Sequence, residues 1–175
     1  MRNILIVVDM QNDFIDGALG TAEAVSIVPK AAEKIRSFDG TVLFTRDTHG
    51  ESYLSTQEGR NLPVPHCIRD TEGWQIREEL RELVRTEPID KPAFGSAELG
   101  EMLRAANGLE SIGRVTLIGL CTDICVISNA MLLKAFLPEA EIVVDAACCA
   151  GVTPESHRRA LDAMRACQII VENDG

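Results

Sequence analysis

The chain has 175 residues, of which 46% are hydrophobic and 25% are charged, and its formal net charge is −10 at pH 7. This composition is typical of a folded globular protein with a substantial core, and we expect one domain over residues 1–175. So acidic a chain has no general attraction for phosphate backbones or anionic lipid, which argues against nucleic-acid and membrane partners.

The first apolar run lies between Asn3 and Asp9. It is too short for the core of a signal peptide or for a membrane span. We therefore expect a cytoplasmic protein whose six cysteines are free thiols, most of them buried in the core.

Short apolar runs rich in β-branched residues alternate with amphipathic segments. The runs predict strands at residues 4–8, 42–45, 115–118, 142–144 and 169–171. The amphipathic segments predict helices at residues 30–38, 73–84, 96–106, 123–137 and 154–166. This alternation predicts an α/β fold, a three-layer doubly wound sheet that is mostly parallel and has helices on both faces.

Polar side chains follow three of the predicted strands. Acids and amides follow the first strand, a basic and acidic segment with His49 follows the second, and thiols follow the strand at residues 115–118. Ligands of such sheets bind beyond the carboxyl ends of the strands. We therefore expect these three loops to form the functional site together.

The segment GLCTDICV, residues 119–126, places Cys121 and Cys125 four positions apart. The two thiols could be metal ligands, a disulfide, buried small residues, or a nucleophile and a bystander. A reducing compartment disfavours a disulfide. Thr122 or Asp123 can cap the following helix, so that Cys125 lies in its first turn, where free N–H groups and the helix dipole stabilise a thiolate. Cys125 is the better nucleophile candidate, and a buried structural cysteine is the alternative.

Two of the three histidines, His49 and His66, lie in one acidic loop with Asp47 and Glu58. Two imidazoles and two carboxylates suit zinc, manganese or iron(II). The alternative is a polar loop whose histidines only form hydrogen bonds. The third histidine, His157, is predicted to lie on a solvated helix face without a functional role.

Four motifs resemble those of the isochorismatase-like cysteine hydrolases, nearest to nicotinamidases and N-carbamoylsarcosine amidases. The motifs are DMQNDF at 9–14, DTH at 47–49, KPAFGS at 91–96 and GLCTDICV at 119–126. The resemblance implies the isochorismatase-like hydrolase fold and a catalytic triad of Asp9, Lys91 and Cys125. It also implies a cis peptide at Leu120–Cys121, with an oxyanion hole formed by the N–H groups of Cys121 and Cys125.

In such a triad Lys91 would hold both a Cys125 thiolate and Asp9 in their ionised forms. Asp9 would take the thiol proton and pass it to the departing ammonia. Without the resemblance, Lys91 would be interpreted as a solvated surface lysine.

Nicotinamidases carry a divalent metal ion that binds the pyridine nitrogen of the substrate. The resemblance therefore implies one ion, Zn²⁺ or alternatively Mn²⁺ or Fe²⁺, on Asp47, His49, Glu58 and His66. Glu58 is assigned to the position of a further family histidine because no histidine lies between His49 and His66, and Glu51 is the alternative.

The substrate pocket is expected to include Gln11, Phe14 and Leu120. Many nicotinamidases have an aromatic residue three positions before the late histidine, where this chain has Pro63. Phe14 would then form one wall of the pocket, and Trp74 is expected to pack structurally.

The resemblance thus implies a hydrolase that cleaves a small, nicotinamide-like carboxamide to acid and ammonia through a thioester. A ureido, carbamoyl or isochorismate-like substrate is the alternative within enzymes, although Cys125 argues against the isochorismatase reaction. A non-catalytic metal- or partner-binding member of the same fold is the alternative outside enzymes. We also expect a homo-oligomer, either a dimer or a tetramer.

Overall fold

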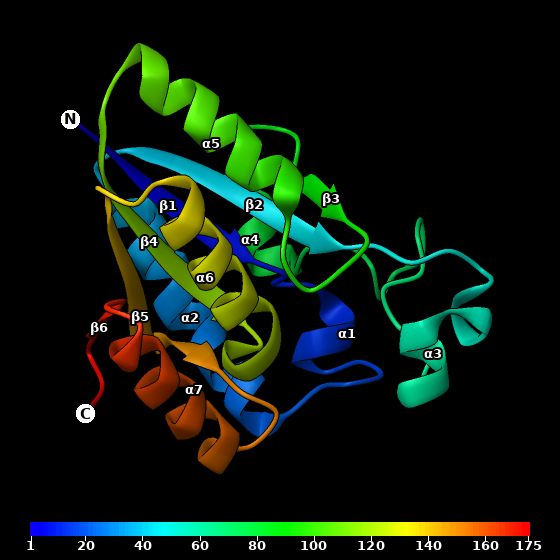
Figure 1. Cartoon of the computed structure of the whole chain (residues 1–175). Helices are drawn as coiled ribbons and strands as arrows, with labels where there is room; N and C mark the ends of the chain where they lie inside the picture. Colours follow the sequence, from blue (N-terminus) through cyan, green and yellow to red (C-terminus); the bar gives the residue numbers. More distant parts are fainter.

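The computed structural model describes residues 1–175 and contains one six-stranded sheet in which every pair of neighbouring strands is parallel. The strands are β1 (Arg2–Val8), β2 (Thr41–Asp47), β3 (Ile89–Lys91), β4 (Ile112–Leu120), β5 (Glu141–Ala150) and β6 (Ile170–Glu172). Their order across the sheet is β3-β2-β1-β4-β5-β6 (Figure 1). The predicted fold class is confirmed, and the sheet is wholly parallel.

Helices cover both faces of the sheet. One face packs against α5 (Ala97–Leu109), α6 (Ile127–Phe136) and α7 (Pro154–Ala166). The other face packs against α1 (Asn12–Ile15), α2 (Ala22–Ser37) and α4 (Glu78–Arg81) (Figure 1). Side chains of β1 alternate between the two cores, since Ile4 and Ile6 belong to the first and Leu5 and Val7 to the second.

The short α3 (Gln57–Asn61) projects beyond the carboxyl end of the sheet, within the long segment between β2 and β3 (Figure 1). It follows a single 3₁₀ turn, Tyr53–Ser55. None of the helices combines the length and the apolar character that a membrane crossing requires.

The predicted helix at residues 30–38 is part of α2, which starts at Ala22 although Pro29 lies inside it. Proline removes a helical N–H and crowds the preceding turn. The helix forms nonetheless because the Thr21 hydroxyl caps its first turn, accepting from Ala24 N–H at 3.0 Å, and because a continuous apolar face is buried. The predicted helix at residues 154–166 agrees with α7, whereas the predicted last strand is displaced by one residue.

The predicted helix at residues 73–84 is wrong except for α4. The backbone of the segment before α4 instead forms hydrogen bonds with the loop that follows β1. Three backbone hydrogen bonds make this connection: Asp13 N–H to Gly73 O at 3.0 Å, Asn12 N–H to Gln75 O at 3.0 Å and Arg77 N–H to Met10 O at 2.9 Å. These tertiary bonds replace the helical ones and fix the loop after Asp9.

The strand β3 was not predicted. It has three residues, Ile89–Lys91, and pairs with Thr45–Asp47 at the end of β2. So short a run carries no detectable period in the sequence. It matters because its last residue is Lys91.

The central strands β1 and β4 are neighbours, and the helices that follow them lie on opposite faces of the sheet. The carboxyl ends of such a strand pair form the switch point at which doubly wound sheets bind ligands. Gly119 of β4 lies against Val8 of β1 there, with a φ of +114°. A Cβ at this position would lie 2.1 Å from the Val8 carbonyl oxygen, so only glycine fits.

We predict that Gly119→Ala destabilises the protein strongly. Overpacking costs roughly 1–3 kcal/mol, and a strained φ adds roughly 1–3 kcal/mol. Urea denaturation followed by circular dichroism measures the free energy of unfolding. Gly108→Ala in α5 is the matched control, since a Cβ there meets nothing within 4 Å and should leave stability unchanged or slightly higher. Equal stability of the two variants would contradict the prediction.

Candidate active site

A buried lysine lies at the carboxyl end of the sheet. Lys91 is only 1% exposed, and its Nζ lies 2.6 Å from Asp9 Oδ2 and 3.4 Å from Cys125 Sγ. The ammonium also donates to the Ala93 carbonyl at 3.1 Å. The structure thus brings together the three predicted triad residues from the end of β3, the end of β1 and the turn after β4.

The Asp9 carboxylate is held by its backbone and by one hydroxyl. Asp9 has a φ of +48°, an uncommon conformation for a non-glycine residue. Thr45 Oγ1 donates to Asp9 Oδ1 at 2.7 Å and accepts from the Asp9 N–H at 3.3 Å. Since Thr45 lies on the neighbouring β2, the sheet itself orients this acid.

Cys125 lies in a π-helical turn, Thr122–Val126, and not in a regular first turn of α6. The Val126 N–H donates to the Cys121 carbonyl at 3.0 Å, which closes the wide turn. Such turns are frequent at functional sites. The peptide Leu120–Cys121 is cis, as the resemblance implied, and the Cys121 N–H donates no hydrogen bond within the protein.

Asn129 connects this turn to the segment that follows Lys91, between β3 and α5. Its Nδ2 donates to the carbonyls of Cys125, at 2.8 Å, and Phe94, at 3.1 Å. Its Oδ1 accepts from the Ser96 N–H at 2.9 Å. This fully bonded buried amide was not singled out from the sequence. A lone polar residue on the buried side of an apolar helix is the signal that could have indicated it.

Burial dominates the protonation of the triad. It raises the pKa of the Cys125 thiol well above its ordinary value, and the Asp9 charge raises it further while Lys91 opposes both. Burial also raises the pKa of Asp9, against the effect of Lys91. Burial alone would lower the pKa of Lys91, but Asp9 and Cys125 raise it on balance.

Burial thus favours the protonated forms of Cys125 and Asp9, and the Lys91 ammonium favours the ionised ones. That Lys91 keeps both groups ionised stays a prediction.

A second group of side chains lies beside the triad. The ligand atoms of Asp47, His49, Glu58 and His66 all lie within 4.8 Å of one another. Asp47 Oδ2 lies 2.8 Å from His49 Nε2 and 3.5 Å from His66 Nε2, and Glu58 Oε1 lies 3.6 Å from His49 Nε2. The alternative ligand Glu51 is exposed and outside the group.

The chemistry of these donors fits a divalent transition metal ion. The His66 Nδ1 lies 2.8 Å from the Val64 carbonyl, and an N–H there leaves the Nε2 lone pair for a ligand. Burial acts to raise the pKa of Asp47, but hydrogen bonds with His49 and His66 hold it well below its usual range. Asp47 is therefore a carboxylate, as a metal ligand must be.

Asp47 also connects the two groups. Its Oδ1 lies 3.4 Å from Lys91 Nζ, while its Oδ2 faces the histidines. One carboxylate thus contacts both the cation of the triad and the candidate metal ligands.

Cys125 of the triad and three of the four candidate metal ligands line one cavity of about 250 Å³. Cys125, Cys121, Asp47, Glu58 and His66 supply part of its lining. Its remaining lining comes from apolar side chains and from two amides on α3: Phe14, Leu19, Leu62, Phe94, Ile124, Gln57 and Asn61. Phe14 was expected here, and its ring also contacts His66 edge-on, with 5.5 Å between ring centroids.

Gln11 and Leu120 do not line this cavity, which corrects the expectation from the sequence. The Gln11 amide is used within the protein, since it accepts from the Asp47 N–H at 2.8 Å and donates to the carbonyls of Asp47 and Trp74, both at 2.9 Å. Leu120 belongs to the core on the α2 face. Trp74 packs structurally, beneath the Arg46 guanidinium at 3.9 Å.

Tyr53 was missed by the sequence analysis. Its ring contacts His49 and His66 edge-on, with centroid distances of 4.8 and 5.0 Å, and its hydroxyl donates to the Leu62 carbonyl at 2.9 Å. No motif marks it, because its role depends on how the loop after β2 folds. The expected position of His157 on a solvated helix face is also wrong, since the residue is half-buried and its ring contacts Thr122 of the cysteine turn.

Comparison with known proteins places the chain in a family. It matches the isochorismatase domain over residues 3–173, and it therefore belongs to the isochorismatase family. The predicted family membership is confirmed.

The similar proteins include nicotinamidases and pyrazinamidases. An uncharacterized isochorismatase family protein of Bacillus subtilis (strain 168), PncA, is 32% identical over 92% of this chain and 93% of its own length. The nicotinamidase/pyrazinamidase of Mycobacterium tuberculosis is 27% identical over 94% and 95%. The crystal structure of the Pyrococcus horikoshii pyrazinamidase in complex with zinc has a TM-score of 0.78 and 31% identity, with 98% of each chain covered.

We predict that Lys91→Met and Asp9→Asn change the reactivity of Cys125 in opposite directions. Without the cation, Cys125 and Asp9 would each keep a proton, so alkylation by iodoacetamide at pH 7 should slow by about tenfold or more. With Asn in place of Asp9, the thiol faces Lys91 alone, and its alkylation should be at least as fast as in the wild type.

Mass spectrometry of the peptide that contains Cys125 measures these rates. Lys134→Met in α6 is the matched control, because Lys134 forms no ion pair. Equal rates in the wild type and Lys91→Met would show that Lys91 is not the electrostatic partner of Cys125.

We further predict that the protein binds about one equivalent of a divalent transition metal ion. Glu58→Gln should lower the bound metal, because an amide oxygen is a weaker ligand than a carboxylate, whereas Glu51→Gln should not. Elemental analysis of protein purified without chelator checks this. Equal metal content in the two variants, or no metal in an active wild type, would contradict the assignment.

Proposed function

We propose that the protein is a metal-assisted cysteine amidase that hydrolyses nicotinamide or a closely related small carboxamide to the acid and ammonia. The observation that carries the proposal is that Cys125 lines one cavity together with three of the four candidate metal ligands, Asp47, Glu58 and His66. Its volume of about 250 Å³ is below the range of about 300–1,000 Å³ that drug-sized ligands occupy, which favours a small substrate. The named activities of several relatives support the same substrate class.

In the first step, the Cys125 sulfur attacks the carboxamide carbon while the thiol proton passes to Asp9. The C–S bond forms and the C–N bond breaks, and Asp9 returns the proton to the departing nitrogen, which leaves as ammonia. Lys91 keeps its proton and stabilises whichever partner carries the negative charge.

In the second step, water attacks the thioester carbon. Asp9 takes a proton from this water, the C–S bond breaks, and the proton restores the Cys125 thiol as the acid is released. The same carboxylate thus serves both halves of the reaction. Its hydrogen bond from the Thr45 hydroxyl holds it in one orientation.

The oxyanion of both steps requires hydrogen-bond donors at the carbonyl oxygen. We assign this role to the N–H groups of Cys121 and Cys125. The Cys121 N–H supports the assignment, because it has no acceptor within the protein and its residue lines the cavity.

Asp47, His49, Glu58 and His66 would hold the metal ion. When bound, the ion supplies a Lewis acid for a ring nitrogen of the substrate. The apolar walls around Phe14, Phe94 and Ile124 exclude water from the reacting carbonyl.

We predict that Cys125→Ala abolishes ammonia release from nicotinamide, with a loss of about 10³-fold or more, because no thioester can form. Cys121→Ala should retain most of the turnover, because only its backbone N–H is required. A coupled assay of ammonia release measures both.

Benzamide is the matched control substrate, since it has the same carboxamide and no ring nitrogen, and it should be hydrolysed more slowly. Loss of activity to the same extent in both cysteine variants would overturn the assignment of the nucleophile. Absence of ammonia release from nicotinamide in the metal-loaded wild type would overturn the proposed substrate.

A further inference from the structure

The turn that carries Cys125 is supported from behind by a histidine of another helix. His157, in the first turn of α7, has its Nδ1 2.7 Å from Thr122 Oγ1. Thr122 directly follows Cys121 and opens the π-helical turn Thr122–Val126. The imidazole therefore contacts the nucleophile turn on the side away from the substrate cavity, which His157 does not line.

The Thr122 hydroxyl depends on this contact. Thr122 is 0% exposed, and His157 is the only hydrogen-bond partner of its hydroxyl within the protein. Burial lowers the pKa of His157, so the ring is neutral at neutral pH and offers one donor and one acceptor. Loss of the imidazole would leave a buried hydroxyl without a partner, which proteins rarely tolerate.

The segment before α7 forms a second contact with the same turn. The Asp123 carboxylate accepts from the Val152 N–H at 3.1 Å. Gly151 packs directly against α7, since a Cβ there would lie 2.9 Å from the His157 backbone nitrogen. The end of β5, the start of α7 and the nucleophile turn are therefore held at fixed positions relative to one another.

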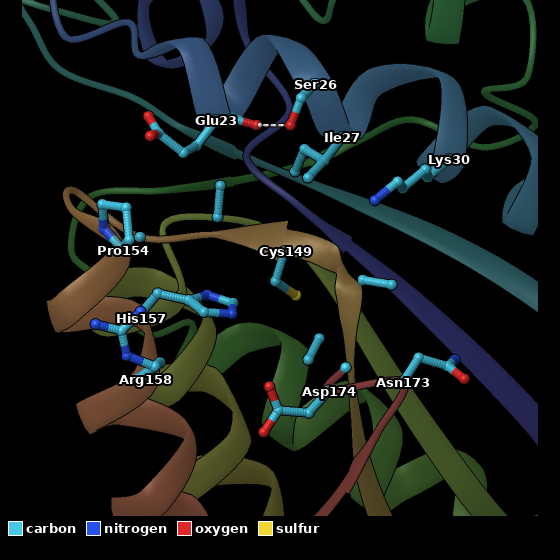
Figure 2. Close-up of a pocket in the computed structure, with 15 residues that line it drawn as sticks. Glu23, Ser26, Ile27, Lys30, Cys149, Pro154, His157, Arg158, Asn173 and Asp174 are labelled. Carbon is cyan, nitrogen blue, oxygen red and sulfur yellow. Dashed lines mark hydrogen bonds between the residues drawn. The ribbon is translucent and has the colours of Figure 1, made fainter.

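Behind the imidazole the protein is not tightly packed. A cavity of about 430 Å³ opens there between α2 and α7, and Figure 2 shows the His157 ring on its wall, directed from α7 toward Cys149 of β5. Its opposite wall includes Ile27 and Lys30 of α2. Without the imidazole, the Thr122 hydroxyl would lose its one side-chain partner, and the hollow would extend toward the turn.

We propose that His157 is a positioning residue for the nucleophile: through Thr122 it holds the turn so that Cys125 Sγ stays within reach of Lys91 Nζ and the oxyanion donors stay aligned. This inference rests on the proposed amidase function for its turnover readout, but the reactivity of the Cys125 thiol tests it independently. Misplacement of reacting groups by about 1 Å can cost about a hundredfold in rate.

The experiment compares His157→Ala, His157→Asn and the wild type, each loaded with metal. For His157→Ala we expect kcat for nicotinamide to fall about tenfold to a hundredfold with KM nearly unchanged, because the turn and not the binding walls is displaced. Alkylation of Cys125 by iodoacetamide at pH 7 should slow in parallel. His157→Asn can bond Thr122 from nearly the position of Nδ1 and should recover most of both rates.

Arg158→Ala is the matched control, since Arg158 lies on the same turn and lines the same cavity without contacting Thr122. Thr122→Val removes the hydroxyl and should reproduce the loss, and adding it to His157→Ala should cause little further loss. Should His157→Ala fail to fold, Thr122→Val and His157→Asn decide the question.

Unchanged alkylation in Thr122→Val, or equal losses in His157→Ala and His157→Asn, would overturn the role of His157. If the wild type does not hydrolyse nicotinamide, the proposed substrate fails, and the alkylation rates alone decide the positioning role.

Discussion

The ammonium of Lys91 is the interaction on which the site depends. Removing a charge from water costs several kcal/mol, so a buried lysine requires close partners of opposite charge. Here Asp9 and Asp47 supply that charge from two neighbouring strands, and Lys91 reaches them from a third. The same cation contacts the Cys125 sulfur. These ionic contacts join groups at the carboxyl ends of three neighbouring strands and place a positive charge beside Cys125.

The sheet was predictable because its strands are buried on both faces. Short, continuous, β-branched runs such as the core of β1 favour buried strands, and the helices between them follow from a 3.6-residue period. Two elements escaped for physical reasons. The strand β3 is too short to show a period. The segment before α4 has a helical sequence pattern, but its backbone forms hydrogen bonds with the loop after Asp9. Tertiary bonds override local propensity there.

The residues of the candidate site that belong to a sequence motif were predictable. The side chains that the fold brings next to them were not. Asp9, Lys91 and Cys125 meet as the motifs implied, and so do the four side chains of the candidate metal group. Gln11 lies in the same motif as Asp9, yet its amide forms hydrogen bonds with the backbone and does not line the cavity. Tyr53 and His157 carry no motif at all. The partner of a polar side chain is decided by distant segments, which a single sequence does not reveal.

The walls of the substrate cavity come from segments outside the sheet. Phe14 belongs to α1, Leu62 directly follows α3, and Phe94 lies in the connection between β3 and α5. The reacting groups, by contrast, are anchored at strand ends and in the turn after β4. Shape and chemistry are thus encoded by separate parts of the chain, and mutation of the walls can redirect the scaffold to new molecules without disturbing bond cleavage. Such modularity makes this architecture an evolvable one.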